Sequence, residues 1–211
     1  MYEQTKGKTP RQKLQKTVLM AVLIAILILM SVTPLGYLKT AGLEITFNLI
    51  PVAIGAVVLG PAAGAALGAV FGITSYCQCL GILGYSAFGA ALNAINPVLT
   101  IITCIVPRIL CGWIPGLLFK WLSGFDKTKF LSHAAACLSC PIVNTLLFMT
   151  CVMGFFGRSD VIMGLRGSRS IIGFVLVFVG INGLVEAVSC FVIATAVAKA
   201  LTVFTSKMKA A

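Results

Sequence analysis

Long apolar stretches, separated by short polar or Pro- and Gly-containing breaks, cover almost the whole chain. The first stretch, TVLMAVLIAILILMSVT at residues 17–33, is uninterrupted and stops at Pro34. A helix needs about 20 apolar residues to cross a bilayer, and the bilayer interior requires every backbone polar group to be hydrogen-bonded within the protein. The stretches are far longer than the strands of a membrane barrel. The pattern therefore predicts an all-α integral membrane protein without strands.

Six transmembrane helices are expected from the positions of these stretches. The predicted spans are residues 17–33, 45–60, 62–76, 97–121, 132–156 and 170–201. The uncharged segment 77–96, which contains several Gly and Asn residues, is interpreted as a loop, although residues 80–95 are also compatible with a helix. The resulting organisation is a basic leader (1–16), a six-helix transmembrane domain (17–205) and a short tail (206–211).

A cleaved signal peptide is the alternative for the first span, because a basic leader followed by an apolar run is the order found in such peptides. The run is long, however, no Ala-x-Ala-like cleavage site follows it, and five further spans come after it. A retained first helix is therefore the favoured interpretation.

The few charged residues support the membrane class and predict an orientation. Only 10% of the residues are charged, 59% are hydrophobic and the mean hydropathy is +1.06, whereas soluble domains contain about 25% charged residues. With the first span starting in the cytoplasm, eleven Lys and Arg residues fall on the inner side and four on the outer side, as the positive-inside rule requires. Both termini are therefore expected to be cytoplasmic, in a multi-pass protein of a bacterial or archaeal plasma membrane.

The net charge of +11 follows from this topology and from contact with anionic lipid headgroups, so no nucleic-acid partner is required. The inner cations are Lys6, Lys8, Arg11, Lys13, Lys16, Lys120, Lys127, Lys129, Lys199, Lys207 and Lys209. The outer cations are Lys39, Arg158, Arg166 and Arg169. The three outer arginines are either ordinary loop charges or groups that attract anionic solutes to the outer mouth.

The eight cysteines do not form a convincing metal site. Cys137-x-x-Cys140 has the spacing of a metal or redox motif, but no second pair accompanies it, and the one histidine, His133, lies near the cytoplasmic end of its span. Buried cysteines usually act as small hydrophobic side chains. Cys77-x-Cys79 lies near the outer surface and is open to oxidation, although its spacing suits a structural bridge poorly. No metal or cofactor is expected.

Catalysis finds little support in this composition, because the chain has five acidic residues and one histidine for acid–base chemistry. An intramembrane enzyme would need a nucleophile and a base, and Ser132-His133 is the one such pair. No nucleotide-binding motif is present, so active transport would depend on a separate energising subunit.

Two charged residues are predicted at membrane depth and are the strongest candidates for function. Arg108 follows Pro107 inside the fourth span, and Glu186 lies well inside the sixth, on the same helical face as Asn182. A charge at this depth costs at least about 2.5–3.5 kcal/mol and usually marks a functional site. Arg108 and Glu186 either pair as a structural ion bridge, or Arg108 faces the carboxylate of a solute, which its planar guanidinium matches.

Uncharged polar residues complete a predicted pocket for a small polar molecule. Such pockets have mostly apolar walls with a few placed donors and acceptors. The candidates in the spans are Asn48, Asn96, Asn144 and Thr145, and segment 77–96 with its flank adds Tyr76, Gln78, Tyr85, Ser86, Phe88 and Asn93. Each Asn taken alone is better explained as a hydrogen-bonding residue in helix packing, and their joint presence on the later spans is what favours a pocket.

Small residues recur every four positions in two places. Gly60, Gly64, Gly68 and Gly72 form a ridge that enters and follows the third span, which predicts close helix packing inside the chain. The first span has a smaller pair, Ala21-x-x-x-Ala25, among otherwise large residues.

Several of these segments together resemble one transporter family. The stretch 44–72, EITFNLIPVAIGAVVLGPAAGAALGAVFG, looks like the second and third helices of the substrate-binding S components of energy-coupling factor (ECF) vitamin transporters. Asn96-Pro97, VPRILCG at 106–112, Asn144-Thr145 and NGLVEA at 182–187 are similar to the pantothenate-type branch.

This resemblance implies a non-enzymatic, six-helix, vitamin-binding subunit with a pocket open to the outside. It also implies a transmembrane coupling subunit with two cytosolic ATPases, which Ala21 and Ala25 would contact, and reorientation of the loaded subunit in the bilayer. The expected substrate site is Asn96, Arg108 and Asn144, with Thr145, Asn182, Glu186, Asn48 and Tyr85. Pantothenate, with one carboxylate, two hydroxyls and an amide, is the preferred ligand.

Other functions remain open at this stage. Riboflavin, folate, pyridoxine or a queuosine-like solute are alternative ligands. A self-sufficient secondary carrier is the competing class, and internal symmetry of the two halves would support it; none is visible in the sequence.

Overall fold

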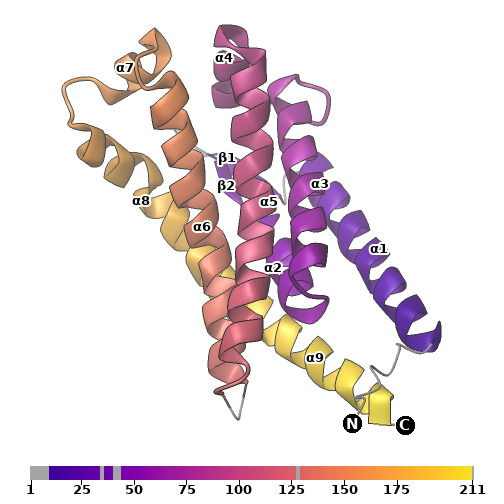
Figure 1. The fold of residues 1–211 in the computed structure, drawn as a ribbon. Coiled ribbons are helices and arrows are strands. Elements are labelled where there is room, and N and C mark those ends of the chain that lie inside the picture. The colour runs from indigo at the N-terminus through magenta and orange to yellow at the C-terminus, as the bar shows by residue number, and fades with distance from the viewer. Residues whose placement is uncertain (1–9, 34–35, 40–43, 127–128, 211) are drawn as a thin grey trace, which may run out of the picture.

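The computed structural model describes residues 10–33, 36–39, 44–126 and 129–210, and Figure 1 shows their arrangement as a helical bundle. The elements in chain order are α1 (Pro10–Val32), β1 (Tyr37–Lys39), β2 (Glu44–Thr46), α2 (Leu49–Val58), α3 (Pro61–Cys79), α4 (Ala87–Ile95), α5 (Pro97–Leu122), α6 (Phe130–Phe156), α7 (Asp160–Arg166), α8 (Ile171–Ser189), the π-helical turn η1 (Cys190–Ala194) and α9 (Thr195–Ala210). Lys6, Lys8, Pro34 and Lys127, which entered the sequence predictions, lie outside the described residues.

Five helical stretches among the described residues are long and apolar enough to cross a membrane, where six were predicted. They are α1, α3, α5, α6 and the stretch Asn182–Phe204, which runs from α8 through η1 into α9. The second predicted span, residues 45–60, contains a shorter helix than expected: α2 has 10 residues. At 1.5 Å per residue, this helix covers about 15 Å, half the thickness of the bilayer core.

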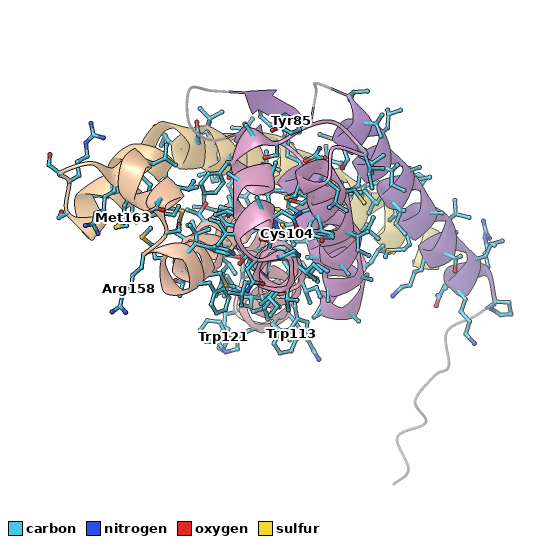
Figure 2. The ribbon with its side chains drawn as sticks, turned by 90° about the horizontal axis from the view of Figure 1, so that it is seen from above. Tyr85, Cys104, Trp113, Trp121, Arg158 and Met163 are labelled. Atoms are coloured by element: carbon cyan, nitrogen blue, oxygen red, sulfur yellow. The ribbon has the colours of Figure 1, made fainter. Side chains whose placement is uncertain are left out.

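A short β-hairpin precedes α2 and contradicts the prediction that the chain has no strands. β1 and β2 pair antiparallel, with Tyr37 opposite Thr46 and Lys39 opposite Glu44. In Figure 1 the hairpin lies behind α5, below the level of α4 and α7, and Figure 2 shows it at the edge of the bundle. With three residues per strand, the hairpin is too short to produce a recognisable alternation of apolar and polar residues, so the sequence pattern did not indicate it.

A buried polar network joins α1, α2 and α3 beside this hairpin. The Asn48 amide donates to Ser31 Oγ (3.1 Å), and Ser31 Oγ donates to Thr74 Oγ1 (3.1 Å). The Gln78 amide donates to the Ser31 carbonyl (3.0 Å). Buried polar groups are costly without partners, so these bonds hold α1 in one register against the bundle.

Glycines let α3 approach α5 closely, as predicted from the small-residue ridge. A Cβ added to Gly68 would lie 2.8 Å from the carbonyl carbon of Arg108, and one added to Gly72 would lie 2.9 Å from Ile105 Cα. Gly64 packs in the same way against Gly112. Gly60 differs from the prediction: its φ of 103° forms the turn before α3, and an added Cβ would contact nothing within 4 Å.

The two ends of the bundle have different structures. Both chain ends lie at one end of the bundle in Figure 1, whereas α4 and α7 lie at the opposite end. Neither short helix was predicted, although a helix within 80–95 was an open alternative. A separate apolar cluster, which includes Leu92, Phe156, Ile162 and Phe174, packs α4 and α7 against α6 and α8. These helices therefore form a fixed wall for the space between them.

Candidate ligand-binding site

A cavity of about 820 Å³ lies among α3 to α8, at the end of the bundle opposite the chain termini. Its volume is in the range of about 300–1,000 Å³ that is usual for small-molecule sites. Exposed residues such as Tyr85 and Asp160 are part of its lining, so the cavity reaches the protein surface. Tyr85 lies at the cavity end of the molecule, which Figure 2 shows from above.

Arg108 of α5 places a charge inside this cavity. Its side chain is 8% exposed, and its guanidinium carbon lies 4.6 Å from the ring centre of Phe148 and 5.5 Å from that of Phe71. The Nη1 atom donates to the carbonyl of Thr103 (2.8 Å), whereas the buried Nε atom has no hydrogen-bond partner among the described residues. The guanidinium is therefore oriented by the protein but retains hydrogen-bonding capacity for a ligand.

The local sequence explains how Arg108 is held. Pro107 has no N–H, so the carbonyl four residues earlier, that of Thr103, receives no helical hydrogen bond from it. The guanidinium of the next residue supplies that bond. On the other side, Gly68 allows α3 to contact the backbone of Arg108 directly. The proline and the glycine together set the position of the charged group.

Glu186 of α8 lines the same cavity, but it does not form a salt bridge with Arg108. Its side chain is 6% exposed, and Oε1 accepts a hydrogen bond from the backbone N–H of Thr46 (2.7 Å). None of the hydrogen bonds and ion pairs described for either side chain joins the two. The carboxylate thus connects α8 to the hairpin, while Asn182, one turn earlier, also lines the cavity.

Asn144 and Thr145 of α6 form the facing part of the wall. Asn144 is 8% exposed, and its buried Oδ1 atom has no hydrogen-bond partner in the described part of the chain. A buried polar atom without a partner is rare in folded proteins, so the Asn144 Oδ1 atom is available as an acceptor for a group that enters the cavity. Arg108 Nε and Asn144 Oδ1 are thus a donor and an acceptor, both buried and both in residues that line the cavity.

The structure brings six of the eight predicted site residues together: Tyr85, Arg108, Asn144, Thr145, Asn182 and Glu186 line the cavity. Asn96 does not. It caps α5, where its Oδ1 accepts from the Leu99 N–H (3.1 Å). Asn48 is fully buried in the network with Ser31 and also lies outside the cavity lining. These two amides are in structural positions.

Several lining residues escaped the sequence analysis. Thr100, Cys104 and Arg108 are spaced four residues apart, which places them on one face of α5. Phe148 stands in the same relation to Asn144 on α6. These spacings were available as a signal, since each set includes a residue already singled out. Asp160 and the other α7 residues had no comparable signal, because that helix was predicted as loop.

The fold and the cavity define a membrane protein that encloses a small-molecule site within its helices. A sequence model described as "ECF transporter, substrate-specific component" matches residues 15–198, so the chain belongs to this family of transport proteins. It is therefore a multi-pass protein of the bacterial cell membrane and not an enzyme. The family predicted from the sequence motifs is confirmed.

Two curated relatives cover nearly the whole chain. The "Pantothenic acid transporter PanT" of Lactococcus lactis subsp. cremoris is 25% identical over 203 residues, which are 91% of this chain and 96% of the relative. The "Pantothenate transporter PanT" of Leuconostoc mesenteroides subsp. mesenteroides is 28% identical over 202 residues, 90% of this chain and 93% of the relative.

Proposed function

We propose that the protein captures pantothenate from outside the cell as the S component of an ATP-driven ECF importer. The observation that carries this proposal is the pair of buried, unpartnered atoms in the cavity, Arg108 Nε and Asn144 Oδ1. Pantothenate has the groups that would complete them, a carboxylate for the cation and hydroxyl or amide donors for the carbonyl. The names of the two relatives point to the same ligand.

The roles of the lining residues follow from their chemistry. Arg108 would receive the carboxylate, because a charge-assisted hydrogen bond to a guanidinium is strong and directional. Asn144, Thr145 and Asn182 would bind the hydroxyl and amide groups, and Glu186 would accept from a hydroxyl. Phe148, already stacked on Arg108, would cover the apolar carbons. A site of this kind leaves no buried polar group of the ligand without a partner.

The topology expected from the charges suits capture from outside. The five long helical stretches together with α2, which crosses only part of the membrane, make six membrane helices. With six helices and both termini in the cytoplasm, the cavity end faces the exterior. Arg158, Arg166 and Arg169 then lie at that end and would attract an anionic solute. Lys120 and Lys129 lie on the loop side of α5 and α6, towards the termini, in agreement with the positive-inside rule.

Energy would come from a coupling subunit with two cytosolic ATPases. Ala21 and Ala25 are exposed on α1, whereas Leu23, Leu27 and Ser31 form its buried face. Small exposed residues at this spacing allow another helix to approach closely in lipid. We place the coupling subunit on the exposed side of α1 that carries Ala21 and Ala25. Reorientation of the loaded protein against that subunit would carry the ligand inward.

Purification of the protein in lipid nanodiscs provides the test. Mass spectrometry of the denatured sample should detect pantothenate, and calorimetry on ligand-free protein should give saturable binding with one site. Riboflavin, folate and pyridoxine serve as matched competitors. Tight binding of one of these, with no response to pantothenate, would overturn the ligand assignment. Uptake by the chain alone in vesicles with a proton or sodium gradient would overturn the S-component mechanism in favour of a carrier.

A further inference from the structure

Two cysteines lie next to each other in the lining of the cavity. Cys79 Sγ, at the end of α3, lies 3.7 Å from Cys104 Sγ on α5. Both residues line the cavity, and both are buried, with 7% and 4% of their surface exposed. Figure 2 labels Cys104 near the centre of the bundle as seen from the cavity end. The structure contains no disulfide among the eight cysteines of the chain.

The glycine seam between α3 and α5 brings the two thiols together. Gly72 lies against Cys104 and Ile105, where an added Cβ would be 3.0 Å from the Cys104 carbonyl oxygen. Cys79 follows Gly72 by seven residues, two helical turns, and therefore lies on the same face of α3. The sulfur is further oriented by its bond to the Ser75 carbonyl (3.3 Å). A disulfide needs a separation of about 2.05 Å, so the sulfurs have to approach by about 1.7 Å.

We propose that Cys79 and Cys104 form a redox-sensitive dithiol site, at which a small peroxide that enters the cavity produces an interhelical disulfide. One thiolate attacks a peroxide oxygen, which breaks the O–O bond and leaves a sulfenic acid and hydroxide. The second thiolate attacks the sulfenic sulfur, forms the S–S bond and releases a second hydroxide. The two protons lost by the thiols convert both hydroxides to water, so the sulfurs lose two electrons and the peroxide gains them.

The site differs from the other close cysteines of the bundle. Cys137 and Cys140 of α6 are fully buried in the apolar core cluster that also contains Cys111 and Cys190, and none of the four lines the cavity. A peroxide that reaches the ligand site therefore meets Cys79 and Cys104 but not this cluster. In addition, α4 packs directly on Cys79, because a Cβ added to Gly89 would lie 3.3 Å from Cys79 Cβ.

Hydrogen peroxide treatment of the purified full-length chain, followed by alkylation and chymotryptic mass spectrometry without reductant, tests the proposal. We expect the Cys79 and Cys104 peptides to be joined, with the loss of two hydrogen atoms, and to separate after reduction. Cys79→Ser should abolish the joined species, whereas Cys77→Ser, two residues earlier in the chain, should retain it. Cys137 and Cys140 should remain reduced during the peroxide treatment, so their peptides should be recovered in the alkylated form. Absence of the joined species, while the half-buried Cys151 is oxidised, would overturn the proposal.

Ligand protection provides a second readout, and this one rests on the proposed function. At about 100 times its Kd, a ligand leaves about 1% of the protein free, so cross-linking should slow at least tenfold if pantothenate fills the cavity beside the thiols. Pantothenate binding is measured separately on the same sample. Cross-linking without any binding would contradict the proposed ligand alone. Binding without protection would contradict the placement of the dithiol in the ligand site.

Discussion

Replacement of Arg108 by methionine tests the central contact of the site. Methionine retains an unbranched apolar stem, but it removes the guanidinium that lies over the rings of Phe148 and Phe71, and with it the charge and the donor atoms. The fold should tolerate this change, because a buried cation without a salt bridge is costly in a bilayer and its removal can even stabilise. The variant should therefore elute as a single species with a melting temperature at or above that of the parent.

Binding should respond strongly. Removal of one partner of a buried, hydrogen-bonded charge pair costs about 2–5 kcal/mol, and about 1.4 kcal/mol corresponds to tenfold in affinity. Because methionine keeps an apolar stem and removes only the guanidinium, we expect a loss of about 3 kcal/mol, which is about 150-fold in Kd for pantothenate by calorimetry. Arg11→Met is the matched control, since Arg11 is exposed, lies at the start of α1 and is outside the cavity lining.

The neutral alcohol that corresponds to pantothenate completes the experiment. It lacks the carboxylate, so its affinity should be nearly the same for the parent protein and for Arg108→Met. The loss should therefore appear only with the charged ligand, which excludes a general disturbance of the cavity. An Arg108→Met variant that binds pantothenate within about threefold of the parent, a difference well below 1.4 kcal/mol, would refute the assignment of this residue.

Three further predictions concern packing, the partner and the hairpin. Gly68→Val should lower the melting temperature by several degrees in a thermal size-exclusion assay, because its side chain would overlap the backbone of α5 and overpacking costs about 1–3 kcal/mol. Ala21→Trp with Ala25→Trp should preserve pantothenate binding but stop uptake in cells that carry the coupling module. Glu186→Leu should speed amide hydrogen exchange at Thr46 by about tenfold or more, since hydrogen bonds to charged groups contribute about 1.5–3 kcal/mol.

Each of these predictions has a matched control in the chain. Gly154→Val should be tolerated, because an added Cβ there contacts nothing within 4 Å, and equal destabilisation at both glycines would contradict the packing argument. Val22→Trp with Ile26→Trp changes exposed residues on another side of α1 and should leave uptake intact; loss of uptake there as well would argue against a specific face. Glu186→Gln keeps an acceptor for the Thr46 amide, so exchange as fast as in the Leu variant would count against the hydrogen bond.

Local features of the chain were sufficient for part of this structure. The apolar stretches determine the membrane class, because no other environment accommodates so few charges in so many residues. The ridge formed by Gly64, Gly68 and Gly72 predicts close helix packing, since the spacing of four residues already puts small side chains on one face. Pro107 beside Arg108 likewise marks a special point in α5. These conclusions depend on neighbours within one or two turns, which the sequence contains directly.

The role of each polar residue was decided by the tertiary structure. Asn48, Asn96 and Asn144 look alike in the sequence, yet they join a buried network, cap a helix and line the cavity, respectively. The role of an amide depends on which donors and acceptors lie within hydrogen-bonding distance. For two of the three residues, the neighbouring groups belong to other helices. An ion bridge between Arg108 and Glu186 also remained an alternative until their separate partners were visible.

The β-hairpin and the dithiol show the same limit. Residues 45 and 46 begin an apolar run, and the pairing of 44–46 with 37–39 depends on how the chain folds back, which the run does not reveal. Cys79 and Cys104 are 25 residues apart and meet because two glycine-containing helices pack closely. The sequence by itself thus determined that the protein lies in a lipid bilayer and which residues share one face of a helix. The tertiary structure decided which polar groups remain unpaired inside the cavity, because hydrogen bonds between distant segments satisfy some of them and leave others for a ligand.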